Sequence, residues 1–299
     1  MTDLMENPTS RRRRPMPSWR ARIRRSGGIP VIIAAAFLAL LVLFALLIPL
    51  ISPTGESAQS SVFNGPPSLQ HWLGTDRLGR DTLIRLLYGA RVSLSLGLMA
   101  TILGGFVGTV IGTISGYVGG KLDAFLAWFI DVLLSFPDLV LGITIVVALG
   151  PGYWQTLVAI AVTLVGRFAR LSRASTISIR NTEYLSAIKV VGAGRLRILA
   201  RHVLPNISGD VIGVGIVWAA HALITESSLS FLGLGVQPPQ SSWGVMVKDA
   251  VQSITYAPWV ALPPGAVLAL AAMAITIVGD YLQARFDPKS RREFNKASV

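Results

Sequence analysis

The sequence has 299 residues, of which 52% are hydrophobic and only 14% are charged. Soluble domains carry about 25% charged residues, so the composition excludes an ordinary soluble protein and indicates an integral membrane protein. The net charge of +12 does not indicate nucleic-acid binding, because the basic residues flank apolar runs and form no patch interleaved with aromatic residues. The absence of cysteine excludes disulfides, thiolate zinc sites and iron–sulfur clusters from this chain.

Residues 1–28 are polar and basic, with a run of arginines from Arg11 to Arg14. We expect a largely disordered cytoplasmic tail there that serves as a topology determinant, and contact with anionic lipid headgroups is its alternative role. Residues 29–51 are apolar and match the roughly 20 residues that cross a bilayer core. We predict that this first span stays attached, since a secretory signal has a shorter apolar region and a small-residue cleavage site.

Residues 52–87 form a polar loop rich in proline and glycine, predicted on the extracytoplasmic side. Asp76, Arg80 and Asp81 are close enough in sequence to form a charge-paired clasp that folds the loop back onto the next span. Direct contact with a substrate is the alternative for these three residues. His71 has no second ligand at metal-binding spacing nearby, so we interpret it as a loop residue.

The second predicted span, residues 88–117, is rich in glycine. Gly104, Gly108 and Gly112 recur every four residues and leave bare backbone along one helix face. We therefore expect this face to contact another helix closely.

The third predicted span, residues 123–149, contains two acidic residues. Asp131 lies about two turns inside the span, where an unpaired charge is costly, so we expect it to face the protein interior and pair with another group. Pro137 and Asp138 predict a kink with a second carboxylate near mid-span. Both carboxylates are candidate pathway groups, and helix–helix contact is their alternative role.

The fourth, fifth and sixth predicted spans cover residues 153–171, 207–236 and 263–283. The fourth ends in the basic series Arg167, Arg170 and Arg173, which we place at the cytoplasmic side. The fifth contains His221 and Glu226 toward its outer half. His221 is expected to be hydrogen-bonded between helices.

Residues 181–206 form a basic, amphipathic insert between the fourth and fifth spans, here called the coupling loop. The pattern predicts a short helix over 182–191, with Glu183 in its first turn, where the helix dipole favours a carboxylate. Gly192 and Gly194 are expected to break this helix.

A second short helix is predicted from Arg195 until Pro205 removes a backbone donor. The apolar faces are too small to form a core of their own, so we expect them to pack on a soluble partner at the membrane surface. These faces consist of Ala187, Val191 and Gly194 in the first part, and of Leu196, Leu199 and Val203 in the second.

The charge distribution predicts the topology of the six spans. With the N-terminus inside, 22 of the 27 lysines and arginines fall on the inner side and 5 on the outer side. The positive-inside rule then places both termini and the coupling loop in the cytoplasm.

The coupling loop resembles the EAA loop of binding-protein-dependent ABC importer permeases. That pattern is Glu-Ala-Ala, three residues, Gly, nine residues, Ile, one residue, Leu-Pro. The match holds at Ala187, Gly192, Leu204 and Pro205. The chain departs from the pattern at Ser186, Ile188 and His202.

Further stretches resemble the second permease subunit of dipeptide and oligopeptide importers, a family that includes nickel importers. The resemblance covers roughly residues 69–288, nearly the whole chain, in collinear order. It is carried by HWLGTDRLGRDTLIRLLYGARVSLSLG at 71–97, GYVGGKLDAFLAWFIDVLLSFPDLVL at 116–141, RHVLPN at 201–206 and ESSLSFLGLGVQPPQSSWG at 226–244.

This resemblance implies the all-α type I importer permease fold, with six transmembrane helices in the cytoplasmic membrane. It implies a pore formed with a homologous permease, two ATPase subunits beneath it and an extracytoplasmic binding protein that delivers peptide. ATP and Mg²⁺ would bind in the partner subunits, because Gly120-Lys121 lacks the upstream glycine of a phosphate-binding loop. This chain would then be no enzyme and hold no cofactor or metal.

We expect closure of the ATPase dimer to move the coupling loop and tilt the fourth and fifth spans. Glu226 is the first candidate to meet a peptide amino terminus, and pairing with a neighbouring loop is its alternative. The candidate ATPase-coupling residues are Glu183, Ser186, Ala187, Lys189, Val191, Gly192, Gly194, Leu204 and Pro205. The candidate pathway residues are Glu226, His221, Asp131 and Asp138.

Three alternatives stay open. The same architecture serves nickel, haem or glutathione in relatives of this family. A proton-coupled transporter would use the four pathway candidates as a relay, although the chain shows no internal repeat of the kind such proteins usually have. A non-transporting scaffold would recruit a cytoplasmic partner through the same loop.

Overall fold

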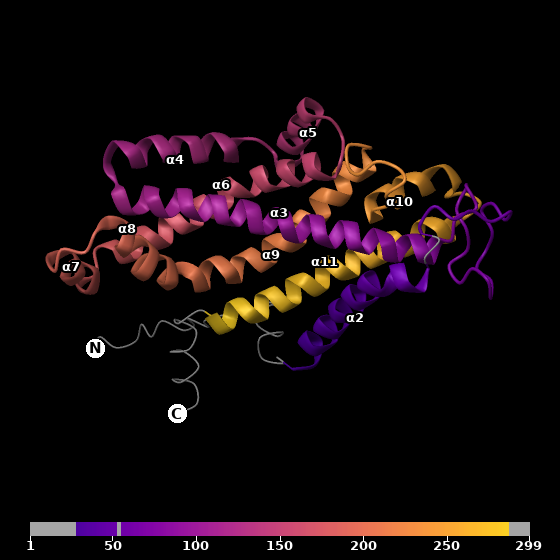
Figure 1. Ribbon diagram of the computed structural model, residues 1–299, viewed down its shortest axis with the longest axis horizontal. Helices are drawn as coiled ribbons and strands as arrows, with labels where there is room; N and C mark the ends of the chain where they lie inside the picture. The colour runs from indigo at the N-terminus through magenta and orange to yellow at the C-terminus, as the bar shows by residue number, and fades with distance from the viewer. Residues whose placement is uncertain (1–27, 53–54, 287–299) are drawn as a thin grey trace, which may run out of the picture.

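The computed structural model describes residues 28–52 and 55–286. Every regular element in these ranges is a helix. Long helices lie side by side along the molecule, with the coupling loop at one end and the polar loop of residues 55–81 at the other (Figure 1). The helices are α2 Ile29–Ile51, α3 Thr82–Val118, α4 Gly120–Ser135, α5 Asp138–Leu149, α6 Tyr153–Arg180, α7 Glu183–Val190, α8 Arg195–Ile198, the π-helix η1 Leu199–Val203, α9 Leu204–Phe231, α10 Trp243–Ala250, the 3-10 helix η2 Val251–Ser253 and α11 Pro258–Phe286.

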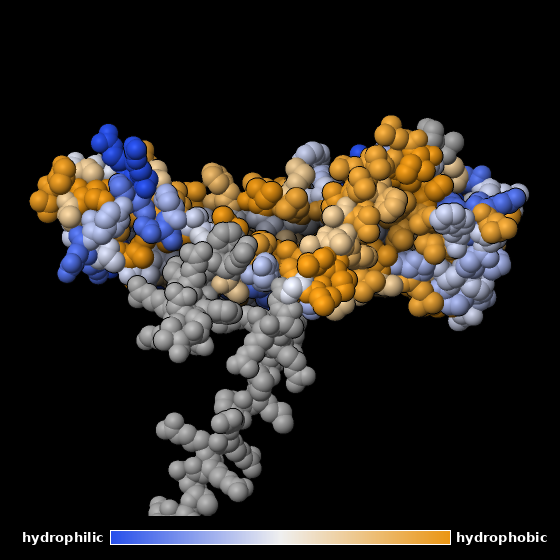
Figure 2. Space-filling model, turned by 90° about the horizontal axis from the view of Figure 1, so that it is seen from below, coloured by the Kyte–Doolittle hydropathy of each residue, from blue (hydrophilic) through white to orange (hydrophobic). Residues whose placement is uncertain are grey.

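Among the described residues, four helices are long and apolar enough to cross a membrane: α2, α3, the continuous segment Arg195–Phe231, and α11. The pair α4 and α5 meets the same criterion together, which gives up to five spans. Apolar side chains cover the middle of the molecule and polar ones gather at both ends (Figure 2). This distribution is typical of a protein embedded in a bilayer.

The third predicted span is not one kinked helix. It consists of α4 and α5, which meet at an angle of 93°. The residue before a proline disfavours the helical conformation, and Phe136 accordingly has extended angles, φ −85° and ψ 137°. The helix therefore stops at Ser135 and restarts at Asp138 in a new direction.

Three glycines of α3 lie against the backbone of α6. A side-chain carbon at any of them would come within 2.1 to 2.5 Å of a carbonyl oxygen of α6. The close contact predicted from the four-residue glycine repeat is thereby confirmed. Because each four-residue step along α3 matches a four-residue step along α6, the two helices run parallel in fixed register. The pairs are Gly104 with Ala161, Gly108 with Val165 and Gly112 with Ala169.

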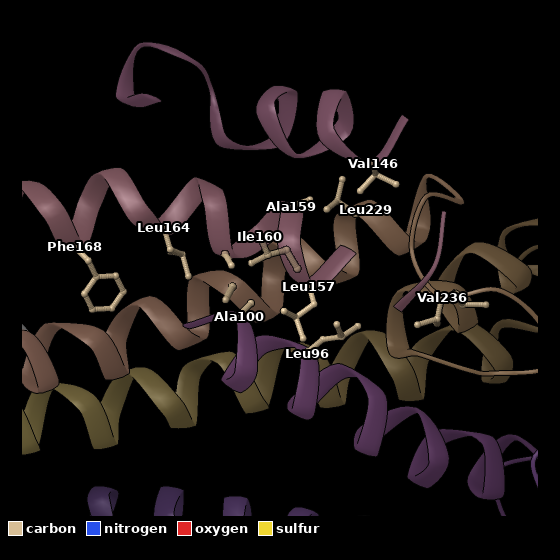
Figure 3. Packing of buried hydrophobic residues seen from close by; sticks show 13 residues of the cluster. Leu96, Ala100, Val146, Leu157, Ala159, Ile160, Leu164, Phe168, Leu229 and Val236 are labelled. Atoms are coloured by element: carbon tan, nitrogen blue, oxygen red, sulfur yellow. The ribbon is translucent and has the colours of Figure 1, made fainter. Parts of the chain in front are cut away.

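The largest hydrophobic core lies between α3, α5, α6 and α9 (Figure 3). Leu96 and Ala100 of α3 meet Ile160 and Leu164 of α6 there, all fully or almost fully buried. Phe168 continues this core toward the coupling loop and stacks edge-on against Trp218 of α9, with ring centroids 4.5 Å apart. Burial of apolar side chains on this scale fixes the four helices together.

The predicted clasp is confirmed in part. Asp76 accepts a hydrogen bond from Nε of Arg80 at 2.7 Å and another from Nη1 of Arg85 at 2.6 Å. Both arginines also reach Asp249 of α10, at 3.3 and 3.2 Å. We call Asp76, Arg80, Arg85 and Asp249 the clasp. It ties the polar loop to the first turn of α3 and to α10.

Asp81 does not belong to the clasp. Its Oδ1 accepts hydrogen bonds from the backbone N–H groups of Leu83 and Ile84, at 2.8 and 3.0 Å, and so caps the N-terminus of α3. Its Oδ2 lies 2.8 Å from Nδ1 of His71. His71 is thus a loop residue held by a carboxylate.

Candidate functional site

The coupling loop consists of α7, α8 and η1 and projects from one end of the bundle (Figure 1). It joins the end of α6 to the start of α9. The short helix predicted over 182–191 is confirmed as α7, with Glu183 in its first turn. Lys189 lies in α7, and Ser186 and Ala187 are exposed on it.

A small core of its own supports the coupling loop. Leu185 of α7 and Ile198 of α8 are 1% exposed, and Val203 of η1 is fully buried. Ile179, at the end of α6, packs against this cluster. The loop therefore holds its shape against the bundle without a partner, and its outward side chains keep defined positions.

The outward side of the loop is apolar and exposed. Tyr184 is 51% exposed, Val190 88%, Val191 87% and Leu196 80%. Arg195, Arg197 and Arg201 are exposed beside them. An apolar patch rimmed by cations is typical of a protein contact surface, and the positive rim favours an acidic partner surface.

The turn after α7 depends on one glycine. Gly192 has φ +84°, a left-handed conformation that residues with a side chain rarely adopt. Gly194 has the ordinary φ of −65°, and nothing lies near the position of its missing side chain. The turn therefore requires Gly192 and not Gly194.

Two details of the predicted second helix are wrong. Pro205 does not end it, because α8, η1 and α9 form one continuous helical segment in which Pro205 occupies the first turn of α9. Pro205 directly follows the π-helix η1, where the N–H of Leu204 donates to the carbonyl of Leu199 and the regular α-helical ladder is interrupted. Leu196 faces outward, and Ile198 takes its place in the core. Leu204 is half-buried and Pro205 is exposed at this junction.

Glu226 is fully buried at the opposite end of α9. Ser230 Oγ donates to its carboxylate at 2.7 Å and Ser227 Oγ at 3.2 Å. No part of this carboxylate is accessible in this conformation. Both serines belong to α9 itself, so these two bonds do not pair Glu226 with a neighbouring loop.

Asp138 and His221 lie together. His221 Nε2 of α9 is 2.9 Å from Oδ2 of Asp138, which confirms the contact expected between helices. Arg167 of α6 forms an ion pair with the same oxygen. The 93° break brings this about, because it turns the first residue of α5 toward α6 and α9.

Asp131 is paired but does not face the interior as predicted. Its Oδ1 lies 2.6 Å from Nη2 of Arg170, and the two side chains are 66% and 62% exposed. A third pair joins Asp123 to Arg173, with distances of 2.6 and 2.8 Å. The pairs form a row along α6, here called the charge ladder.

The pairing of Arg167, Arg170 and Arg173 was not predicted from the sequence. The sequence predicted that they form the basic end of the fourth span. Instead, α6 continues to Arg180, and the three arginines face carboxylates of α4 and α5. A signal was present, since arginines three residues apart share one face of a helix. The partners could not be deduced without the break between α4 and α5.

The family model of the binding-protein-dependent transport system inner membrane component matches residues 108–292, more than half of the chain. The chain belongs to this family of transport permeases. Two similar proteins extend the match toward the N-terminus. A protein named as a peptide transport system permease of Brucella abortus is 37% identical over 262 residues, which cover 87% of this chain and 88% of that protein.

A second relative of this permease is named the glutathione transport system permease protein GsiD, from Shigella flexneri. It is 38% identical over 258 residues, which cover 86% of this chain and 85% of that protein. The chain is therefore an ABC importer permease of the type I family, and its close relatives are membrane transport subunits and not enzymes.

Among solved structures, the inward-facing MetNI methionine ABC transporter has a similar fold. The TM-score is 0.57 at 16% identity, and the match covers 69% of this permease and 96% of that chain. At this identity the likeness shows the fold alone. The resemblance stated from the sequence is thus confirmed at the level of the family and the fold.

Proposed function

We propose that this chain is one of two permease subunits of an ATP-driven importer that moves peptides or peptide-like compounds into the cytoplasm. The names of the relatives support cargo of this class, since one concerns peptides and the other glutathione. Glutathione is itself a tripeptide, so the two names agree on the chemistry of the cargo. ATP and Mg²⁺ bind in separate ATPase subunits.

The observation that carries this proposal is the outward face of the coupling loop. Val190, Val191 and Leu196 are 80 to 88% exposed on a pair of helices that rest on a core of their own. An ATPase that grips this face can move α6 and α9, because the loop is rooted at the ends of both. Tilting these helices changes access to a pathway between the two permeases.

The positive-inside rule supports a membrane orientation in which the coupling loop and both termini lie in the cytoplasm. The clasp then lies outside, where the extracytoplasmic binding protein delivers cargo. The proton-coupled alternative is disfavoured, because two carboxylates of that relay, Asp131 and Asp138, are each paired with an arginine.

The decisive experiment is purification of the tagged chain from membranes of cells that express the whole importer. We expect it to carry with it a second permease and two ATPase chains. Ala187→Asp places a charge on the exposed side of α7 and should remove the ATPases while the second permease remains bound. Leu69→Asp is the matched control, because Leu69 is 96% exposed at the opposite end. Retention of the ATPases by Ala187→Asp would contradict the docking role.

A further inference from the structure

Arg167 of the charge ladder lies level with the uncharged part of α3. Arg167 lies between Val165 and Ala169 of α6, which face Gly108 and Gly112 of α3. Residues 92–120, which comprise most of α3 and the turn after it, contain no charged residue. Arg167 is therefore level with an apolar part of the bundle. An arginine in hydrocarbon costs about 2.5–3.5 kcal/mol even on the insertion scales that give the lowest values. Contact of this face with lipid is therefore energetically unfavourable.

The same face is open in the isolated chain. The exposed fractions are 29% for Arg167, 23% for Asp138 and 42% for His221, and the neighbouring pair of Asp131 and Arg170 is more exposed still. Charged groups that are exposed at membrane depth line water or another protein subunit. We infer that this face of α4, α5 and α6 borders the water-filled pathway and not lipid.

The cluster at Asp138 retains unused binding capacity. Both Arg167 and His221 contact Oδ2 of the carboxylate, and Oδ1 has no hydrogen-bond or ion-pair partner among the described residues. Arg167 uses only Nη2, which leaves further N–H donors of the guanidinium free for a ligand. An unpaired carboxylate oxygen of Asp138 and unpaired guanidinium N–H groups of Arg167 therefore lie side by side.

A groove lies between α5, α9, α10 and α11. It has a volume of about 310 Å³ and is lined by Leu139, Ile224 and Ser228 among others. Leu139 follows Asp138 directly, and Ile224 lies one helical turn after His221. The groove is thus bordered by sequence neighbours of the cluster, although none of the three cluster residues lines it.

We propose that Asp138, Arg167 and His221 form a contact point for zwitterionic cargo inside the pathway. The carboxylate of Asp138 receives a protonated amino group, and the guanidinium of Arg167 receives a carboxylate, with His221 as a further donor or acceptor. Free peptides and glutathione carry both groups, so this site rests on the proposed function and narrows its substrate class. Because the cargo must open the existing ion pair, binding stays weak, as passage through a pathway requires.

The test uses the assembled importer with its binding protein and measures uptake of radiolabelled Ala-Ala, Ala-Ala amide and N-acetyl-Ala-Ala. Each rate is divided by the wild-type rate for the same compound, which cancels the preference of the binding protein. Arg167→Gln should lower uptake of Ala-Ala about tenfold or more, since a charge-assisted contact is lost, and should leave the amide near its wild-type rate. Asp138→Asn should lower Ala-Ala and its amide but spare the acetylated compound.

The matched control is Arg173→Gln, which breaks a neighbouring pair of the ladder outside the proposed contact point and should not distinguish the three compounds. Equal losses for all compounds in Arg167→Gln, with normal membrane levels and normal ATPase copurification, would overturn the contact point and leave the proposed function intact. Failure of the wild-type importer to take up any of the three compounds, and glutathione as well, would overturn both.

An independent readout tests whether the face meets water. The chain has no cysteine, so Asp131→Cys introduces a single thiol, and Leu46→Cys provides a control of matched exposure, 65% against 66%, on the apolar helix α2. We expect a charged methanethiosulfonate reagent to label the first in the assembled importer and not the second. An unlabelled thiol at position 131 would overturn the assignment of this face.

Discussion

The clasp and the coupling loop lie at opposite ends of the same bundle and differ in what they leave exposed. In the clasp, Asp76 and Arg85 are 2% and 3% exposed, and their charges are met by the chain itself. In the coupling loop, Val190 and Val191 are almost nine-tenths exposed. The charges of the clasp are thus paired within one subunit, although Nε of Arg85 has no hydrogen-bond partner among the described residues. The loop has a buried core but leaves a large apolar surface exposed.

The largest expected effect concerns the clasp. Asp76→Ala leaves Arg85 buried with only Asp249 as a partner, and loss of one member of a buried pair costs about 3–5 kcal/mol. We expect a clearly lower thermal unfolding midpoint for the detergent-solubilised protein. Arg77→Ala is the control, since Arg77 is exposed and bonds only to Gln252, and it should change the midpoint little. Similar midpoints for the two variants would show that the clasp contributes no special stability.

The second prediction separates the two sides of the coupling loop. Leu185→Ala removes a buried side chain from the small core and should cost about 2–5 kcal/mol of local stability, visible as faster hydrogen exchange of loop amides. Leu196→Ala, on the exposed side, should leave exchange unchanged and weaken ATPase copurification instead. If both variants accelerated exchange equally, the division of the loop into a supporting core and a contact face would be wrong.

The smallest effect concerns the turn. Gly192→Ala forces a side chain into φ +84° and should cost about 1–3 kcal/mol, which loosens α7 and lowers the rate of uptake. Gly194→Ala, at φ −65°, should be neutral or slightly stabilising. Limited proteolysis of the loop in the two variants provides the comparison. Greater sensitivity of Gly194→Ala would contradict it.

The sequence predicted the elements that depend on local chemistry. The glycine repeat of α3, the helix α7 and the turn at Gly192 follow from spacing and backbone preference, and the structure contains all three. The link between Asp76 and Arg80 was also visible, because the two residues lie four positions apart. These features needed no knowledge of how distant segments pack.

Two failures have physical causes that periodicity does not reveal. Ile198 and Val203 are five residues apart and both buried, because the π-helix η1 replaces the spacing of an α-helix there. The expected stripe through Leu196 assumed α-helical spacing. The row of ion pairs on α6 was missed because it depends on a 93° change of direction after Ser135.

The fixed register between α3 and α6 also determines how a displacement is transmitted along the helix bundle. A helix of 37 residues is a strut roughly 55 Å long, and its glycines interlock with α6 so closely that neither helix can slide along the other. A displacement of the end of α6 that joins the coupling loop is therefore shared by α3, whose other end carries Arg85. A displacement at the coupling loop can therefore reach the clasp through two packed helices.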